Sequence, residues 1–180
     1  ILDKNIINCL PLEEKNNKGK FSILVLGGSQ GAEIFGTIIP TVVKMIKDAG
    51  YEIEINQQCI IIQKNSIINF YEKNNIKNYV FGFDKNILKL ALSSSLAITR
   101  CGASTTAELA NTLTPFIAVP LPNSVDNHQY LNAKYYENKG CCWLLEQDNF
   151  NTENLFNLII ETIKNKNKLE NIRKNMKKEH

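Results

Sequence analysis

The feature that most constrains the fold is an alternation of short apolar runs with segments of helical periodicity. The first run, FSILVL, stops at two glycines, as expected of a strand that is buried on both faces of a sheet. Apolar residues then recur at helical spacing from Ile34 to Ile46. We expect this helix to be kinked or shortened at Pro40 and to end near Gly50.

The alternation continues to the end of the chain. The pattern predicts further strands in residues 51–55, 78–83, 95–99, 115–122 and 141–146. It predicts further helices in residues 60–74, 85–94, 104–112, 125–140 and 152–178. Asp126 is the expected N-cap of the helix over 125–140, and Gly140 lies just past its end. This order predicts an α/β fold, a Rossmann-like doubly wound parallel sheet with right-handed crossovers.

Length and charge divide the chain into three parts. The 180 residues can form one domain with a sizeable core. We expect a lead-in or linker segment at 1–20, the α/β domain at 21–163 and a basic helical tail at 164–180. The lysines of the tail could form a membrane-surface patch, although a solvated helix face is the simpler interpretation.

Composition excludes several classes of protein. The net charge of +3, without a Lys/Arg stripe among aromatic residues, argues against nucleic acid as a partner. Five cysteines without a C-x-x-C pair favour neither a disulfide framework nor a zinc site, and they indicate reduced, mostly buried thiols in a cytosolic protein. Adjacent Cys141 and Cys142 would point to opposite faces of a strand. The sequence shows no signal peptide, and no apolar run approaches the roughly 20 residues of a membrane span.

Four polar clusters follow predicted strands, where ligands bind in open parallel sheets. The first contains Gly28, Ser29 and Gln30. Its glycines let backbone N–H groups approach a phosphate, and the following helix N-terminus favours negative charge. The cluster fits neither a P-loop nor G-x-G-x-x-G, so a plain tight turn is an equal alternative. The second cluster is Phe83 with Asp84; an aromatic ring there can stack on a base, or it can belong to the core.

The third cluster is the stretch RCGASTTAE, which begins at Arg100. Ser104 and Thr105 open a helix, and Glu108 lies one turn further along the same face. A carboxylate there can accept hydrogen bonds from two ribose hydroxyls while N–H groups hold a diphosphate. Alternatively, Glu108 caps the helix, and Arg100 is a buried structural ion-pair partner.

The fourth cluster contains His128, Gln129 and Asn132. Gln129 and Asn132 share a helical face, and their amides suit sugar hydroxyls because they both donate and accept. His128 taken alone indicates a surface or capping histidine as readily as a functional one. Together the four clusters describe a nucleotide-sugar site, which makes the domain at 21–163 nucleotide-sugar-binding.

Three motifs in this order, LGGSQGA, RCGASTTAEL and VPLPNSVDNHQYLNAKYYENKG, resemble the MurG family of N-acetylglucosaminyl transferases. The resemblance covers about residues 21–147. It implies that this chain is the C-terminal, donor-binding half of a two-domain GT-B glycosyltransferase of peptidoglycan synthesis. The donor would be UDP-N-acetylglucosamine, and transfer to the lipid-linked muramyl-pentapeptide would be inverting, without a cofactor or a required metal. The complete enzyme would be cytoplasmic, at the inner face of the cell membrane.

The resemblance also implies roles for single residues. The diphosphate would lie against Gly28, Ser29 and Gln30. The uracil would lie against Phe83 and the backbone of Asp84. The other implied contacts are Ser104 and Thr105 near the phosphates, Glu108 on the ribose, and Gln129 with His128 on the sugar, supported by Asn132. Arg100 matches a family arginine whose contact stays open.

Several departures from the family pattern limit what we expect of this chain. It lacks the Gly-rich acceptor loop, the histidine proposed as general base and the junction segment Gly-Asn-Pro-Val-Arg. We therefore expect no catalytic residue here, no transfer by this chain alone, and peripheral membrane contact only through the missing half. Near residue 57 the chain reads QQCI instead of His-Gln-Thr-Gly, and Asp84 replaces an aliphatic residue.

Two other functions remain open. The chain could be a stand-alone nucleotide-sugar-binding subunit that works with a separate membrane-associated acceptor chain, or the remnant of a split or decaying gene. A NAD-dependent oxidoreductase is disfavoured because the glycine spacing is wrong and no acidic residue follows at the expected distance.

Overall fold

The strands form one parallel sheet in the computed structural model, which describes residues 20–28 and 32–179. Its order is β3-β2-β1-β4-β5-β6, and every neighbouring pair is parallel. The strands are β1 (Phe21–Leu26), β2 (Ile53–Gln58), β3 (Lys77–Phe81), β4 (Leu96–Thr99), β5 (Phe116–Ala118) and β6 (Cys142–Leu144). This order confirms the predicted Rossmann-like sheet, and the direction of winding reverses between β1 and β4.

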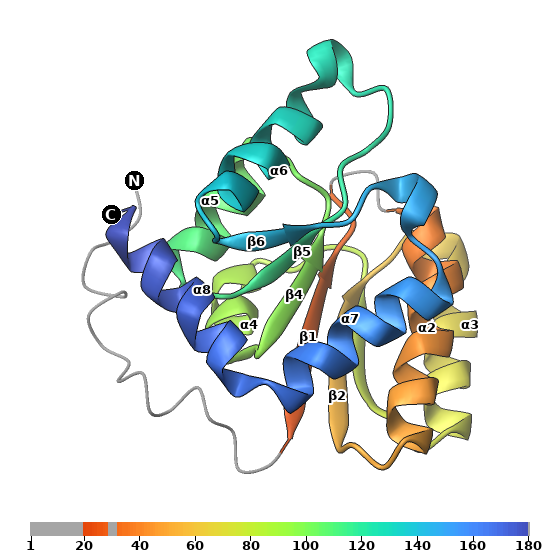
Figure 1. Ribbon diagram of the computed structural model, residues 1–180. Helices are drawn as coiled ribbons and strands as arrows, with labels where there is room; N and C mark the ends of the chain where they lie inside the picture. The colour runs from red at the N-terminus through yellow and green to blue at the C-terminus, as the bar shows by residue number, and fades with distance from the viewer. Residues whose placement is uncertain (1–19, 29–31, 180) are drawn as a thin grey trace.

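Helices cover both faces of the sheet (Figure 1). They are α2 (Glu33–Asp48), α3 (Ile61–Lys73), α4 (Ile87–Ser93), α5 (Ala103–Asn111), α6 (His128–Asn138), α7 (Thr152–Lys164) and α8 (Lys166–Lys178). Two 3-10 turns precede α6 and α7, namely η2 (Val125–Asn127) and η3 (Gln147–Asn149). Helices α2, α3 and α7 pack on one face, and α4, α5 and α6 pack on the other.

The apolar run of β1 supplies both cores. Ile23 and Val25 lie in the core under α2 and α7, whereas Leu24 and Leu26 lie in the core under α5 and α6. Because successive side chains of a strand point to opposite faces, a strand covered on both sides needs apolar residues at every position. This requirement explains why the first strand shows no alternation in the sequence.

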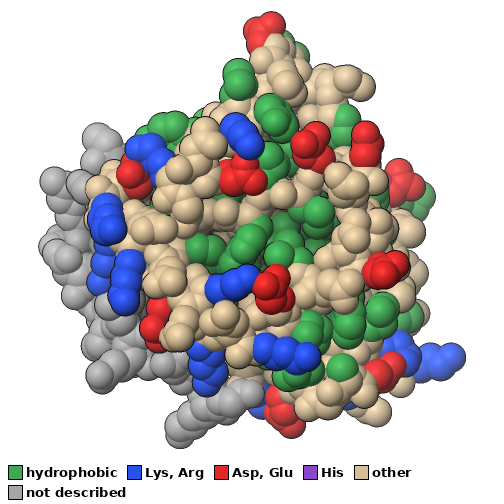
Figure 2. All heavy atoms as spheres, viewed as in Figure 1, with side chains coloured by type: hydrophobic (Ala, Val, Ile, Leu, Met, Phe, Trp, Pro, Cys, Tyr) green, Lys and Arg blue, Asp and Glu red, His purple; other side chains and the backbone are tan. Residues whose placement is uncertain are grey.

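Helix α8 has one buried side and one basic side. Its buried residues are Leu169, Ile172 and Met176. Its exposed residues include Lys166, Lys174, Lys177 and Lys178, and basic side chains gather over this helix at the left of the face shown in Figure 2. Because residues 1–19 lie outside the described residues, the division into lead-in, domain and tail stays a prediction.

Strand β2 begins and ends later than the predicted strand at 51–55, which was therefore misplaced. Parallel pairing with β1 carries it to Gln57, and pairing with β3 carries it to Gln58. The fully buried Gln57 amide is satisfied there, because it accepts from the Tyr71 hydroxyl at 2.5 Å and donates to the Phe35 carbonyl at 3.4 Å. The polar end of this strand is stabilised by contacts that the sequence pattern does not reveal.

Three further predictions about the helices differ from the structure. Helix α2 continues through the buried Pro40 instead of being shortened there, and it ends at Asp48, near Gly50 as predicted. The predicted helix over 152–178 is two helices separated at Asn165. Asp126 does not cap α6: it has a φ of 48° in η2, and left-handed Asn127 precedes the helix without a capping bond. An N-cap needs extended backbone, which the left-handed residues of this turn do not provide.

Candidate functional site

A cleft of about 890 Å³ opens where the winding of the sheet reverses. Its lining comes from the β1–α2 turn with the first turns of α2, from the β4–α5 turn, and from Leu121, Gln129 and Gln147. Both α2 and α5 begin at this cleft, so their free N–H groups and the positive ends of their dipoles lie there. Parallel α/β sheets bind ligands at this topological position.

The cleft brings together five of the residues singled out in the sequence. They are Gly28, Arg100, Ser104, Thr105 and Gln129. Gly28 has a φ of +82°, a left-handed conformation in which any other side chain would be strained. Ser29 and Gln30 lie outside the described residues. The remaining candidates are not part of the lining, namely Phe83, Asp84, Glu108, His128 and Asn132.

Arg100 ties together the carboxyl ends of three strands. Its Nη1 donates to the carbonyls of Val119 at 3.1 Å and Pro120 at 3.0 Å, just after β5. Its Nη2 donates to Oε1 of Gln147 at 2.5 Å, after β6, and its guanidinium lies 5.0 Å from the centre of the Phe35 ring. Burial lowers the pKa of Arg100. The expected alternative of a structural ion pair is wrong within the described residues, because these partners are carbonyls, an amide and a ring.

Two amide side chains of α6 hold the peptide groups on either side of Cys101. Oε1 of Gln129 accepts from the backbone N–H of Cys101 at 3.1 Å and from that of Leu121 at 3.0 Å. Nδ2 of Asn132 donates to the carbonyl of Cys101 at 3.0 Å. The thiol of Cys101 is buried, which raises its pKa to about 12. Helix α6 therefore fixes the turn from which α5 begins.

The carboxylate of Glu108 makes no hydrogen bond or ion pair within residues 20–28 and 32–179. The N-cap of α5 is Gly102, and no side chain caps this helix. The alternative in which Glu108 caps α5 is therefore wrong. Glu108 is half-buried, one turn beyond Thr105 at the cleft.

The Asp84 side chain is used within its own loop. It accepts from the backbone N–H of Asn86 at 2.7 Å and from the Tyr79 hydroxyl at 2.9 Å. These hydrogen bonds, the backbone one first, lower the pKa of its carboxyl group. The neighbouring Phe83 is 79% exposed, so the alternative in which it belongs to the core is wrong.

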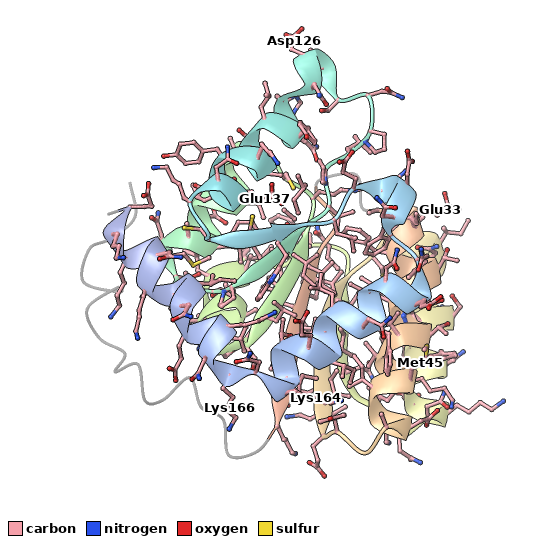
Figure 3. All side chains as sticks on the ribbon, viewed as in Figure 1. Glu33, Met45, Asp126, Glu137, Lys164 and Lys166 are labelled. Atoms are coloured by element: carbon pink, nitrogen blue, oxygen red, sulfur yellow. The ribbon has the colours of Figure 1, made fainter. Side chains whose placement is uncertain are left out.

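His128 begins α6 beside the projecting tip that carries Asp126 (Figure 3). Its Nδ1 donates to the carbonyl of Val125 at 2.6 Å, and the residue is exposed. This local bond matches the interpretation of His128 as a histidine of a helix terminus.

Sequence reasoning missed Gln147 and Glu33, both of which line the cleft. Gln147 follows a strand in the same way as the four clusters, so the rule about carboxyl ends could have found it. Glu33 lies in the first turn of α2 (Figure 3), where an acidic residue reads as a favourable partner of the helix dipole.

Comparison with known proteins identifies the family. Residues 22–180 match the model described as glycosyltransferase family 28 C-terminal domain. The chain belongs to glycosyltransferase family 28. It is 37% identical, over 98% of its length, to the UDP-N-acetylglucosamine–N-acetylmuramyl-(pentapeptide) pyrophosphoryl-undecaprenol N-acetylglucosamine transferase of Pelagibacter ubique. The protein of the same name from Rickettsia bellii is 38% identical over 93% of this chain.

Solved structures agree with this assignment. Acinetobacter baumannii MurG matches 92% of the chain with a TM-score of 0.80 and 27% identity. The C-terminal CMP-Kdo binding domain of WaaA from the same organism shares the fold alone, with a TM-score of 0.67 and 5% identity. The resemblance to the MurG family and the GT-B half-fold are therefore confirmed.

The chain spans about half the length of the relatives it matches, 49% of the Pelagibacter protein and 48% of the Acinetobacter one. It corresponds to the C-terminal domain of these transferases. Within residues 20–28 and 32–179, no helix is long and apolar enough to cross a membrane. The same residues contain no cluster of three or more metal-ligating side chains.

Proposed function

We propose that the cleft binds UDP-N-acetylglucosamine, so that this chain is the donor half of an inverting N-acetylglucosaminyl transferase. The observation that carries the proposal is the convergence of two helix N-termini and the Arg100 guanidinium on one cleft. The helix N-termini and the guanidinium each favour negative charge, and a diphosphate leaving group is negatively charged. Curated relatives over the whole chain are named for this donor.

The parts of the donor follow the order of the loops along the sheet edge. The diphosphate lies against Gly28 and the α5 N-terminus at Ser104 and Thr105. The ribose reaches Glu108, whose carboxylate has no hydrogen bond or ion pair among the described residues and can accept from two hydroxyls. The uracil lies along Phe83 and the backbone of Asp84, since the Asp84 side chain is already engaged.

The sugar extends toward the start of α6, with His128 beside it. Only Nε2 of Gln129 is available to a sugar hydroxyl, because its Oε1 already accepts two backbone N–H groups. Asn132 acts indirectly through Cys101. In this arrangement α6 recognises the sugar through one hydrogen-bond donor, Nε2 of Gln129.

The other substrate and the membrane belong to the remainder of the complete enzyme. We propose that an N-terminal half or partner chain binds the lipid-linked muramyl-pentapeptide at the inner face of the cell membrane and supplies the general base. This chain alone should give no transfer product from donor and acceptor. Product formed with it as sole protein would contradict the proposal.

Calorimetric titration with UDP-N-acetylglucosamine tests donor binding directly. We expect saturable binding, with a lower affinity for UDP-glucose than for UDP-N-acetylglucosamine. Glu108→Ala should reduce the affinity for UDP-N-acetylglucosamine about tenfold. This factor corresponds to a loss of about 1.4 kcal/mol, because the variant lacks hydrogen bonds to a charged group. Glu72→Ala, at an exposed position of α3, is the matched control and should bind like the original. We also expect EDTA to leave the affinity unchanged, because Arg100 and the helix N-termini balance the diphosphate. Equal binding of both sugars would refute the assigned donor.

A further inference from the structure

Among the described residues, Arg100 has no ion-pair partner that would balance its charge. Arg100 is only 7% exposed and lines the cleft. Its partners are the carbonyls of Val119 and Pro120, the amide of Gln147 and the Phe35 ring. The ion pairs within residues 20–28 and 32–179 do not include it. A buried guanidinium in this position has lost hydration without gaining a carboxylate.

Gln147 stands at a position where a carboxylate would neutralise Arg100, because its Oε1 accepts from the guanidinium. Its chain neighbours Glu146 and Asp148 are acidic and exposed, whereas the neutral Gln147 turns toward the guanidinium. A glutamate has nearly the same shape as a glutamine and would form a stronger, charge-assisted bond with an arginine. The amide therefore fixes the direction of the guanidinium and leaves its charge in place.

Glu33 does not take over this role. It lines the same cleft, but its carboxylate lies in no ion pair among the described residues, and Arg100 is not within ion-pair distance of it. The first turn of α2 instead provides positive helix-dipole charge beside the Glu33 side chain.

We infer that Gln147 is a positioning residue that holds the buried Arg100 guanidinium without neutralising it, and so makes the cleft selective for anionic ligands. The identity of the ligand, a nucleoside diphosphate, rests on the proposed function. The conclusion that the ligand is negatively charged rests only on the partners of Arg100.

The test compares Gln147→Glu with Gln147→Ala by calorimetry against uridine, UMP, UDP and inorganic pyrophosphate. We expect Gln147→Glu to weaken UDP and pyrophosphate on the order of ten- to a hundredfold, because the new carboxylate cancels the charge that the anion uses. Uridine binding should not change. The melting temperature should stay at or above that of the original protein, because the variant gains an ion pair. Gln147→Ala should lose less UDP affinity than Gln147→Glu does. Its melting temperature should be lower than that of the original protein.

The two variants separate positioning of a charge from simple support. If Gln147 only supported the loop, the stronger bond of Gln147→Glu would preserve anion binding better than Gln147→Ala. Asn149→Asp is the matched control, since it adds the same charge at an exposed position of the same turn. It should change UDP affinity less than about twofold, because solvent screens exposed charges.

Other outcomes distinguish a failure of the inference from a failure of the proposed function. Gln147→Glu that binds UDP within twofold of the original overturns the inference. So does an original protein that binds uridine as tightly as UDP. If pyrophosphate binding is lost in Gln147→Glu but the original shows no preference for uridine nucleotides, the inference stands and the proposed donor is wrong. Absence of all binding by folded protein overturns both. If Gln147→Glu does not fold, Gln147→Ala provides the test. Its loss of affinity must then increase from uridine to UMP to UDP, and an equal loss of affinity for all three ligands overturns the inference.

Discussion

The carboxyl edge of the sheet is built in different ways on the two sides of β1, with a rigid rim after β4, β5 and β6 and an open rim after β2 and β3. On the side of β4, β5 and β6, Arg100 joins three strand ends, and α6 holds both peptide groups of Cys101. The open rim carries Ile61 and Ile62 at the start of α3 and Phe83 after β3, outside the lining of the cleft and with 79–84% exposure. Within the described residues, the turn after β3 is held by Gln58 bonding the Gly82 carbonyl and by the local bonds of Asp84.

This difference indicates that the two ends of the donor are recognised by different means. Groups already held in place stabilise charge without a cost of reorganisation, which suits the diphosphate end. An exposed aromatic ring contributes contact area only when a ligand covers it, which suits the base end. We therefore expect substitutions on the rigid rim to affect both folding and affinity, and those on the open rim to affect affinity alone.

The largest effect should come from Arg100→Met. It leaves the Val119 and Pro120 carbonyls without their donor, so the free energy of unfolding should fall by about 2 kcal/mol. UDP affinity should fall by roughly a hundredfold or more, because a desolvated charge next to the anion is gone. Urea denaturation and calorimetry measure the two. Arg173→Met, on α8, is the control and should bind UDP normally; an affinity loss of equal size there would break the comparison.

Asn132→Ala tests how firmly α6 holds the turn before α5. Loss of the bond to the Cys101 carbonyl should lower the free energy of unfolding by about 1 kcal/mol and UDP affinity about fivefold. Asn138→Ala, exposed at the end of the same helix, should change neither. If both variants behave alike in thermal unfolding and titration, the hold of α6 on the turn has no role in binding.

Phe83→Ala should sharpen the contrast from the other side. Because Phe83 is 79% exposed, the free energy of unfolding should change by less than about 0.5 kcal/mol. UDP affinity should fall about fivefold through lost stacking, while inorganic pyrophosphate binds unchanged. Ile62→Ala is the control at a second exposed apolar residue. A clear drop in melting temperature would show that this rim is more rigid than its exposure indicates.

The smallest effect concerns Asp84 and appears only in acid. Hydrogen bonds from Asn86 and Tyr79 lower the pKa of Asp84 in the folded protein. Its contribution to stability is therefore complete above the unfolded value of about 3.9 and is lost as the pH falls through the lower folded value. Unfolding curves of the original and Asp84→Asn should differ at neutral pH and converge in strong acid. A difference that is the same from pH 3 to pH 7 would mean that the carboxylate charge has no part in these bonds.

Much of the fold could be predicted because burial on both faces leaves a nearly continuous apolar signature in the central strands β1, β4 and β5. The prediction failed where polar groups are satisfied by distant partners. Gln57 extends β2 because Tyr71 and Phe35 complete its hydrogen bonds, and no local pattern shows this. Asp126 has the residue type of an N-cap but the backbone of a left-handed turn, which sequence alone does not distinguish.

The candidate site could be located but not fully interpreted. The rule that parallel strands present their carboxyl ends to ligands brought Gly28, Arg100, Ser104, Thr105 and Gln129 to one cleft. The role of Arg100 stayed open in the sequence because its hydrogen-bond partners lie 19 to 47 residues away along the chain. Gln147 was missed although it follows β6, and the ligand contacts of all these residues stay predictions.

The burial of Cys101 gives the rigid rim a built-in chemical reporter. Only the thiolate reacts with alkylating or disulfide reagents, and this thiol is both enclosed and held protonated by a pKa of about 12. Its labelling rate should therefore follow the opening of the turn that α6 holds, on the timescale of local unfolding. Ligand-dependent protection of this sulfur, read by mass spectrometry, would report occupancy of the cleft without a label in the ligand.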